Sequence, residues 1–302
     1  MDYVAAVRRA SAADLMLLLT VTIWALNFTV SKYILDAGLR PLPYSSLRYS
    51  AAALVFVALT YPRERSFRIA RADLPLVVLA ALLLLTNQLS FVYALDLTTA
   101  TTAALLFGTL PIFTALISRL VGIERLGRRF WIAASLSFVG VVLVTAGSGR
   151  SVSANLWGDL LAVLGAATWG AYSVAISPLM RRYSPFRLSA VFLAAVSIAL
   201  LLLASPELGD QSFDIGWLAW AGFAFAVVGP LVLTNLLWFT AIDLVGPARA
   251  SLFANLQPFL AAIIALLLLD EQLTRAQVAG GFAIAAGIVL AREPRPPLEP
   301  GE

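Results

Sequence analysis

Long apolar runs dominate the sequence, and short polar or proline-containing breaks separate them. A helix needs roughly 20 apolar residues to cross a hydrocarbon layer about 30 Å thick, and the runs have this length. The alternation in segments of about ten residues that marks a membrane β-barrel is missing. The pattern predicts an all-α membrane protein with ten transmembrane helices, over residues 14–35, 43–61, 73–95, 98–121, 128–147, 157–180, 185–205, 215–241, 245–269 and 274–291.

The composition agrees with this prediction. Hydrophobic residues make up 61% of the 302 residues and charged residues only 13%, whereas soluble domains hold about 45–50% apolar and about 25% charged residues. A soluble domain of about 300 residues buries only about three quarters of its unfolded surface, which leaves too much apolar surface here. A soluble globular protein, a disordered chain and a nucleic-acid binder are therefore excluded.

The arginines indicate an orientation. With a cytoplasmic N-terminus, inside segments hold 14 of the 21 basic residues and outside segments only Arg40, Arg150 and Arg275. This positive-inside bias predicts that both termini are cytoplasmic, and it explains the basic pI without nucleic acid. The remaining cations fall within spans near the interfaces, where we interpret them as snorkelling or salt-bridged, with carboxylate binding as the alternative: Lys32, Arg48, Arg119 and Arg249.

The chain contains no cysteine and no histidine. This excludes disulfides, thiol nucleophiles, His-ligated zinc and histidine bases. We therefore expect no catalytic residue, no metal and no cofactor, and we expect that the protein is not an enzyme.

The second half of the chain repeats the first. Residues 94–143 align without gaps onto residues 241–290, and the matched residues include proline, glutamate and glycine as well as leucine. Because each half holds five spans, an odd number, the halves must enter the membrane in opposite orientations. The sequence thus predicts two inverted five-helix repeats, over 1–150 and 151–302, with a site between them near the midplane. The informative pairs are Trp24 and Trp169, Pro111 and Pro258, Glu124 and Glu271, and Gly140 and Gly287.

Specific motifs carry a family resemblance. The first half combines Trp24 and Arg48 with the run TTATTAALLFGTLPIFTALISRLVGIE, and the second half has a Glu-x-Leu-Thr-x-x-Gln-x-x-Gly cadence that starts at Glu271 and continues to Gly287. Together they resemble the EamA-type half-repeat of the drug/metabolite transporter superfamily, and the overall layout is similar to the YddG-type aromatic amino-acid exporters. The first half departs from the cadence after Glu124, where Arg128-Arg129-Phe130 follows without the glutamine or the first glycine. The resemblance implies ten helices, cytoplasmic termini, a bacterial inner-membrane location and export of small metabolites.

Polar and aromatic residues within the spans predict a cavity, because such residues are costly unless they face the interior of the bundle. In the first span, Thr20, Trp24, Asn27 and Ser31 share one helical face. Helix packing or an interhelical hydrogen bond is the competing interpretation for each residue. The proposed substrate-binding residues are Trp24, Asn27, Gln88, Phe91, Thr101, Trp169, Tyr172, Asn235, Trp238 and Asn255.

Prolines and one glycine inside spans suggest hinges. A proline in a helix interior frees a carbonyl and bends the axis, which gives either a moving hinge or a static kink. The candidate hinge or gate residues are Gly108, Pro111, Pro230 and Pro258.

These observations predict a secondary transporter that exports small zwitterionic metabolites, most of all aromatic or broadly apolar amino acids, by alternating access. No acidic residue lies near the centre of a span, so a carboxylate-based proton cycle is doubtful and a facilitator is favoured. The alternatives are a phosphorylated-sugar or nucleotide-sugar exchanger, a membrane-embedded enzyme or lipid-handling protein, and an ion channel. The expected partners are an amino-acid substrate and the lipid bilayer, without nucleic acid, for a chain that acts as a monomer.

Overall fold

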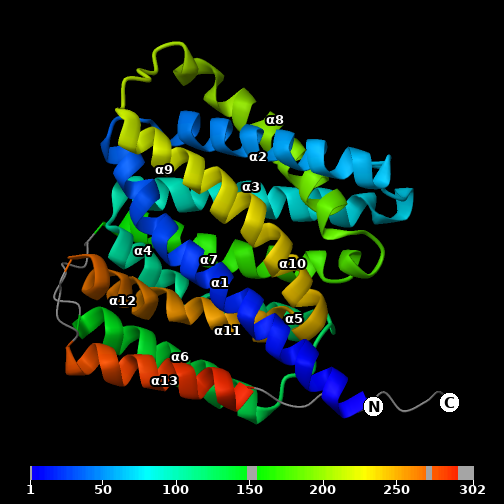
Figure 1. Cartoon of the computed structure of the whole chain (residues 1–302), viewed down its shortest axis with the longest axis vertical. Helices are drawn as coiled ribbons and strands as arrows, with labels where there is room; N and C mark the ends of the chain where they lie inside the picture. The colour runs from blue at the N-terminus through cyan, green and yellow to red at the C-terminus, as the bar shows by residue number, and fades with distance from the viewer. Residues whose placement is uncertain (1, 148–154, 270–273, 292–302) are drawn as a thin grey trace.

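The computed structural model describes residues 2–147, 155–269 and 274–291, and the regular structure in these ranges is helical, without a strand (Figure 1). In the first half, a 3-10 turn at Arg71–Asp73 precedes the third helix. The helices of this half are α1 (Asp2–Asp36), α2 (Pro41–Glu64), α3 (Leu74–Leu97), α4 (Ala100–Phe107), α5 (Leu110–Leu120) and α6 (Arg128–Gly147).

The second half contains short non-α segments between its helices. They are 3-10 turns at Leu179–Arg181 and Phe253–Leu256 and a π-helical segment at Val228–Leu233. The helices are α7 (Leu156–Ile176), α8 (Pro185–Leu208), α9 (Trp217–Val227), α10 (Thr234–Val245), α11 (Pro247–Leu252), α12 (Gln257–Leu269) and α13 (Arg275–Ala291).

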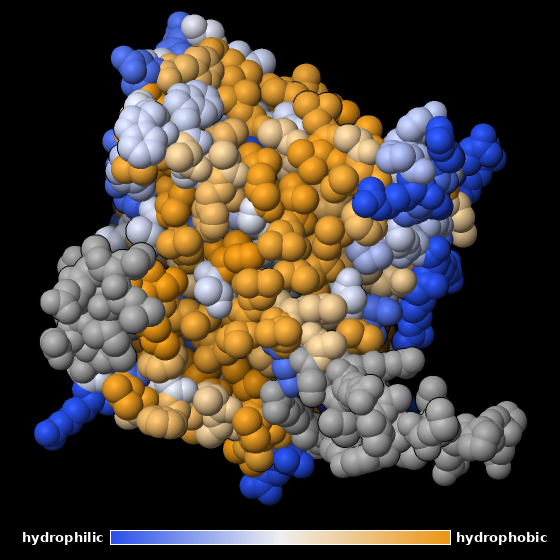
Figure 2. All heavy atoms as spheres, viewed as in Figure 1, coloured by the Kyte–Doolittle hydropathy of each residue, from blue (hydrophilic) through white to orange (hydrophobic). Residues whose placement is uncertain are grey.

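Eight helical segments within the described residues are long and apolar enough to cross a membrane. The helix α13 is apolar but only 17 residues long, and the predicted span 245–269 consists of three shorter pieces. The membrane-protein fold is therefore confirmed, whereas the count of ten stays a prediction. Figure 2 shows a broad apolar belt on the side in view, with hydrophilic residues toward the two ends of the helices.

Three spans are irregular where the sequence places a proline. Gly108 and Thr109 separate α4 from α5, and Pro111 lies in the first turn of α5. Pro230 lies within the π-helical segment, and Pro258 is the second residue of α12, directly after a 3-10 turn. Proline lacks an N–H group, so it is tolerated in a first turn or where the α-helical ladder is already interrupted.

Most of the extensive helix contacts join the two halves. The helix α2 packs along α8, α3 along α7, α1 along α9 and α10, and α6 along α13. The core is consequently shared between the halves and not divided into two separate domains.

The pair α6 and α13 forms a glycine seam, in which backbones touch directly. A Cβ atom at Gly140 would lie 2.6 Å from the Gly280 carbonyl oxygen, and a Cβ at Gly287 would lie 2.7 Å from the Ala133 carbonyl oxygen. Ala133 on α6 meets Gly287 on α13, and Gly140, seven residues later on α6, meets Gly280, seven residues earlier on α13. The two helices are therefore antiparallel. Small residues permit this close approach of membrane helices.

Arginines cluster at one end of the molecule, which we call the arginine-rich end. It holds the loops at 65–70, 121–127 and 182–184, together with the start of α1 and the end of α13 (Figure 1). The α1–α2 turn, with Arg40, lies at the opposite end and contacts the α8–α9 loop, where Gln211 accepts a hydrogen bond of 3.0 Å from the Arg40 N–H. Arg150, Arg292, Arg295 and Glu271, which entered the predictions from the sequence, lie outside the described residues.

Candidate functional site

A small cavity of about 80 Å³ lies between the two halves of the bundle. Its wall draws on α1, α2, α3, α4 and α5 from the first half and on α7, the π-helical segment and α12 from the second. The lining residues are Trp24, Asn27, Phe28, Arg48, Tyr49, Asn87, Gln88, Phe91, Phe107, Leu110, Trp169, Pro230, Leu231 and Gln257.

Two tryptophans from the two halves meet in the cavity wall. The ring centroids of Trp24 and Trp169 are 5.2 Å apart with the planes at 87°, the edge-to-face arrangement that aromatic pairs prefer. The Trp24 indole donates a hydrogen bond of 3.1 Å to the Thr234 hydroxyl on α10. These contacts fix an aromatic surface that an apolar or aromatic side chain could cover.

An aromatic layer closes the cavity behind these rings. Trp238 is fully buried, 4.9 Å from the Trp24 ring, and donates a hydrogen bond of 3.2 Å to the Ser173 hydroxyl. Tyr172 packs 5.4 Å from the Trp169 ring and also contacts Phe192 and Phe239. Neither Trp238 nor Tyr172 belongs to the cavity lining.

A chain of hydrogen bonds runs along the first-half side of the cavity. The Ser31 and Tyr44 hydroxyls are 2.7 Å apart, and Ser31 also donates to the Asn27 amide oxygen over 3.3 Å. The Gln88 amide group donates to the Ser45 hydroxyl over 2.9 Å. These bonds orient Asn27 and Gln88 toward fixed partners while both side chains still line the cavity.

Arg48 joins this chain, although carboxylate binding was only the alternative to snorkelling or a salt bridge in the interpretation of the sequence. Its guanidinium donates to the Tyr44 hydroxyl over 3.0 Å and to the Gln88 amide oxygen over 2.7 Å. Snorkelling does not fit a residue that is 2% exposed and lines the cavity. The spacing to Tyr44, four residues earlier on the same helix face, was the available signal.

Three buried polar atoms of the cavity lining have no hydrogen-bond partner in the protein. They are the Arg48 Nε and Trp169 Nε1 donors and the Gln257 Oε1 acceptor. Buried polar groups are nearly always paired, so these three residues of the cavity wall each have a polar atom for which the protein supplies no partner. Gln257 had not been singled out in the sequence.

The predicted site residues fall into two groups. Trp24, Asn27, Gln88, Phe91, Trp169 and Pro230 line the cavity. Asn235 donates instead to the Leu231 carbonyl over 2.6 Å, and Asn255 donates to the Ser137 hydroxyl over 3.0 Å, beside α6. The others outside the lining are Tyr172 and Trp238 in the aromatic layer, Thr101 on α4, and Gly108, Pro111 and Pro258 at the irregular points of their spans.

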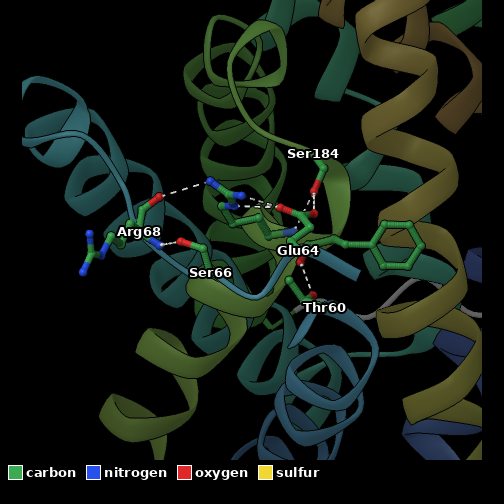
Figure 3. Close-up of polar contacts among 7 residues, drawn as sticks. Thr60, Glu64, Ser66, Arg68 and Ser184 are labelled. Atoms are coloured by element: carbon green, nitrogen blue, oxygen red, sulfur yellow. Dashed lines mark hydrogen bonds and ion pairs between the residues drawn. The ribbon is translucent and has the colours of Figure 1, made fainter. Parts of the chain in front are cut away.

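Ion pairs join the two halves at the arginine-rich end. The Arg187 Nη2 atom lies 2.7 Å from the Glu64 Oε2 atom, and the Ser184 hydroxyl donates to the other Glu64 oxygen. Figure 3 shows Glu64 and Ser184 facing each other across this boundary, with Thr60 close by. Thr60 adds a third link, since its hydroxyl donates to the Phe186 carbonyl over 3.1 Å.

A second ion pair lies beside the first. Arg182 contacts Asp73 over 2.5 Å, and the Tyr183 hydroxyl donates to the other Asp73 oxygen over 2.7 Å. Glu64 is the last residue of α2, sixteen residues after Arg48, which places the ion pairs about 24 Å from Arg48 along the helix. The ion pairs therefore lie well away from the cavity, at the arginine-rich end.

No group of three or more histidine, cysteine, aspartate or glutamate side chains that could hold a metal occurs among the described residues. The acidic residues described above serve as partners of arginines at the arginine-rich end.

The chain is similar to proteins known as transporters. It is 24% identical over 277 residues to an uncharacterized transporter of Archaeoglobus fulgidus, covering 91% of this chain and 97% of that one. It is 26% identical to the uncharacterized transporter YdfC of Bacillus subtilis, over 79% of this chain and 76% of that one. It is also 26% identical to the uncharacterized inner membrane transporter YedA of Escherichia coli K12, over 83% of this chain and 81% of that one.

A solved crystal structure of a protein superposes on this chain with a TM-score of 0.78, at 19% identity, over 93% of this chain and 96% of that one, which supports the fold alone. The model of the EamA-like transporter family matches twice, over residues 11–146 and 156–292. The narrower resemblance to aromatic amino-acid exporters is not confirmed, since these relatives carry only the general description of transporter. The two matches span both predicted repeats and nearly the whole chain, which therefore belongs to the EamA-like transporter family and is a transporter, not an enzyme.

Proposed function

We propose that this transporter exports aromatic or broadly apolar amino acids across the bacterial inner membrane by alternating access. The observation that carries the proposal is the composition of the cavity wall. It combines the Trp24 and Trp169 rings with unpaired hydrogen-bond donors and an unpaired amide acceptor. An amino acid offers a matching set, with a carboxylate as acceptor, an ammonium group as donor and a side chain to cover the rings.

The inverted arrangement of the two halves supports alternating access. The helices α6 and α13 occupy the fifth position of their halves, and the glycine seam makes them antiparallel. At an offset of 147 residues, Gly140 corresponds to Gly287 and Ala133 to Gly280. The contact of Gly140 with Gly280 is therefore the repeat equivalent of the contact of Gly287 with Ala133. A two-fold axis in the membrane plane would relate two such contacts.

The orientation is argued from charge. Positive residues favour the cytoplasmic side, so the arginine-rich end faces the cytoplasm in this proposal and both termini lie there. The inner-membrane location rests on the similarity to YedA, which is described as an inner membrane transporter. The ion pairs of Glu64 and Asp73 then close the cytoplasmic side, while substrate would reach the cavity from that side after they open.

The exchanger alternative fits the cavity less well. A phosphorylated sugar carries about two negative charges, which calls for several cations at the site. Among the described lining residues Arg48 is the one charged group. We therefore retain the amino-acid proposal.

The test is transport by the purified protein in liposomes. Vesicles loaded with unlabelled amino acid are given labelled phenylalanine, tryptophan, leucine or glutamate, and counterflow is measured with and without a pH gradient. The proposal predicts uptake of the aromatic and apolar amino acids and little uptake of glutamate. Uptake that ignores the pH gradient would support a facilitator.

Vesicles that contain the Trp24→Ala protein provide the matched negative control. The proposal is wrong if none of the four amino acids exchanges faster through the parent protein than through protein-free vesicles.

A further inference from the structure

We propose that Arg48 is the carboxylate-binding residue of the cavity, so that the substrate must carry a carboxylate. This inference deepens the proposed function and rests on the same cavity. It assigns to one side chain the part of the substrate that the protein recognises by charge.

The Arg48 guanidinium is buried without a carboxylate partner among the described residues. An arginine stays protonated in proteins, and burial of a cation without a partner is costly. Arg48 is 2% exposed, yet its two hydrogen-bond partners, the Tyr44 hydroxyl and the Gln88 amide oxygen, are both neutral. No carboxylate among the described residues pairs with it.

The geometry of the Arg48 guanidinium suits a carboxylate. A guanidinium offers five N–H donors in a planar fork, and a carboxylate engages two of them at once. The neutral partners of Arg48 accept one hydrogen bond from Nη1 and one from Nη2, while its Nε atom is buried without a partner. Because Arg48 lines the cavity, a carboxylate there can supply both the missing hydrogen bond and the missing negative charge.

The surroundings hold the guanidinium in place. Its central carbon lies 4.9 Å from the Tyr44 ring centroid and 6.0 Å from that of Phe91, within the range of cation–π contacts. The same Gln88 side chain that accepts from Arg48 donates to Ser45, which fixes which end of its amide faces the arginine. A positioned cation recognises an anion better than a mobile one, since less side-chain freedom is lost on binding.

The second half lacks an equivalent cation. Pro43 aligns with Pro185, and at the same offset of 142 residues the position equivalent to Arg48 is the buried Ala190. The charge is therefore specific to one side of an otherwise repeated structure. A substrate with a carboxylate at one end would bind in one orientation, with its carboxylate toward α2.

The test compares matched ligands on the purified parent protein. One pair is 3-phenylpropionate and 3-phenylpropionamide, which differ only in the charged group, and the other is phenylalanine and phenylalaninamide. Propionate and leucine, each with its amide, extend the panel to aliphatic bodies. Binding is measured by isothermal calorimetry and by tryptophan fluorescence. We expect each acid to bind about 10- to 100-fold more tightly than its amide, the range for a hydrogen-bonded charge.

Two variants locate the effect. In Arg48→Gln the acids should lose that advantage, so that each acid and its amide bind equally. Arg40→Gln removes the same charge from an exposed residue at the start of the same helix and should leave the discrimination intact. Size-exclusion and thermal unfolding profiles check the fold of both variants, and the ligand comparison on the parent protein stands without either of them.

The outcomes separate this inference from the proposed function. If 3-phenylpropionate binds and phenylalanine does not, Arg48 keeps its role and the amino-acid substrate is wrong. Amides that bind as tightly as their acids would overturn the role of Arg48 even if phenylalanine is transported. Discrimination that persists in Arg48→Gln, or a complete lack of binding by every carboxylate at millimolar concentration, would overturn it as well.

Discussion

Trp24 and Trp169 occupy corresponding positions in the two halves of the chain and touch each other at a centroid distance of 5.2 Å. A repeated sequence thus supplies both rings of one contact, at the boundary between the halves and in the wall of the cavity. Since each ring comes from a different half, a movement of one half against the other must alter the aromatic surface offered to a ligand.

Replacement of either tryptophan by alanine should reduce transport. Loss of one ring removes about 1.5 kcal/mol of contact with an aromatic substrate, which corresponds to roughly a tenfold weaker interaction. We expect the counterflow rate of Trp24→Ala and Trp169→Ala vesicles at low substrate concentration to fall by about that factor. Trp217→Ala serves as the control, because Trp217 is 80% exposed at the start of α9; equal rates in all three variants would contradict the assignment.

The ion pair of Glu64 and Arg187 should hold the arginine-rich end closed. Neutralisation by Glu64→Gln removes a partly buried pair, worth about 1 kcal/mol after allowance for its exposure, and should shift the population of open molecules about fivefold. The chain contains no cysteine, so a single Ala175→Cys, at a buried position near the end of α7, reports access to the interior through its rate of alkylation. We expect faster alkylation in the Glu64→Gln background.

The reversed pair provides the matched control. A Glu64→Arg and Arg187→Glu double variant restores opposite charges and should return alkylation to the parental rate. An unchanged rate in Glu64→Gln would mean that this pair does not contribute to closure.

The glycine seam should not accept even one methyl group. A Cβ at Gly140 would overlap the Gly280 carbonyl oxygen, and backbone is unable to move aside as a flexible side chain does. We expect Gly140→Ala to destabilise the protein by about 1–3 kcal/mol, the usual cost of overpacking, with a lower unfolding temperature in detergent. Gly209→Ala, where nothing lies within 4 Å of the added carbon, should have little effect. Equal unfolding temperatures would argue against a close seam.

The proline at the start of α12 should act on rate and not on affinity. If Pro258 marks a hinge, Pro258→Ala continues the helix through the 3-10 turn and slows the conformational change, while the cavity lining keeps its residues. We expect a lower maximal counterflow rate with unchanged phenylalanine affinity. A parental rate would identify a static kink instead.

The helix pattern followed directly from the sequence because length and apolarity determine membrane spans. The predicted span at 98–121 corresponds to α4 and α5, and the interruption at Gly108 and Thr109 lies beside the proline that signalled it. The repeat alignment also identified Trp24 and Trp169. A tryptophan shared at equivalent positions is informative because the surrounding helices consist largely of leucine and alanine, which match by chance.

The position of Asn255 could not be predicted, because its span does not keep one helical period. A 3-10 turn advances about 120° per residue instead of 100°, so the four residues Phe253–Leu256 rotate the following face by roughly 80°. Asn255 lies within this turn and bonds Ser137 on α6 instead of lining the cavity. A helical projection of the sequence assumes about 100° per residue throughout, so it assigns the residues in and after this turn to the wrong face.

The contacts of Arg48 could not be predicted from the sequence. Its partner Gln88 is 40 residues away, on another helix, and only tertiary packing brings the two together. A charged residue near the end of a predicted span is usually interpreted as lying at the membrane interface. In the structure the Arg48 guanidinium lies among the rings of Tyr44, Tyr49 and Phe91.

The close contact of Gly140 with Gly280 has a mechanical consequence. Helices that meet through side chains can slide by changing rotamers, but here main chain meets main chain at two points seven residues apart. Neither separation nor register can change there without loss of the contact. Any movement of one half against the other therefore has to preserve the α6–α13 contact, which restricts the direction of that movement.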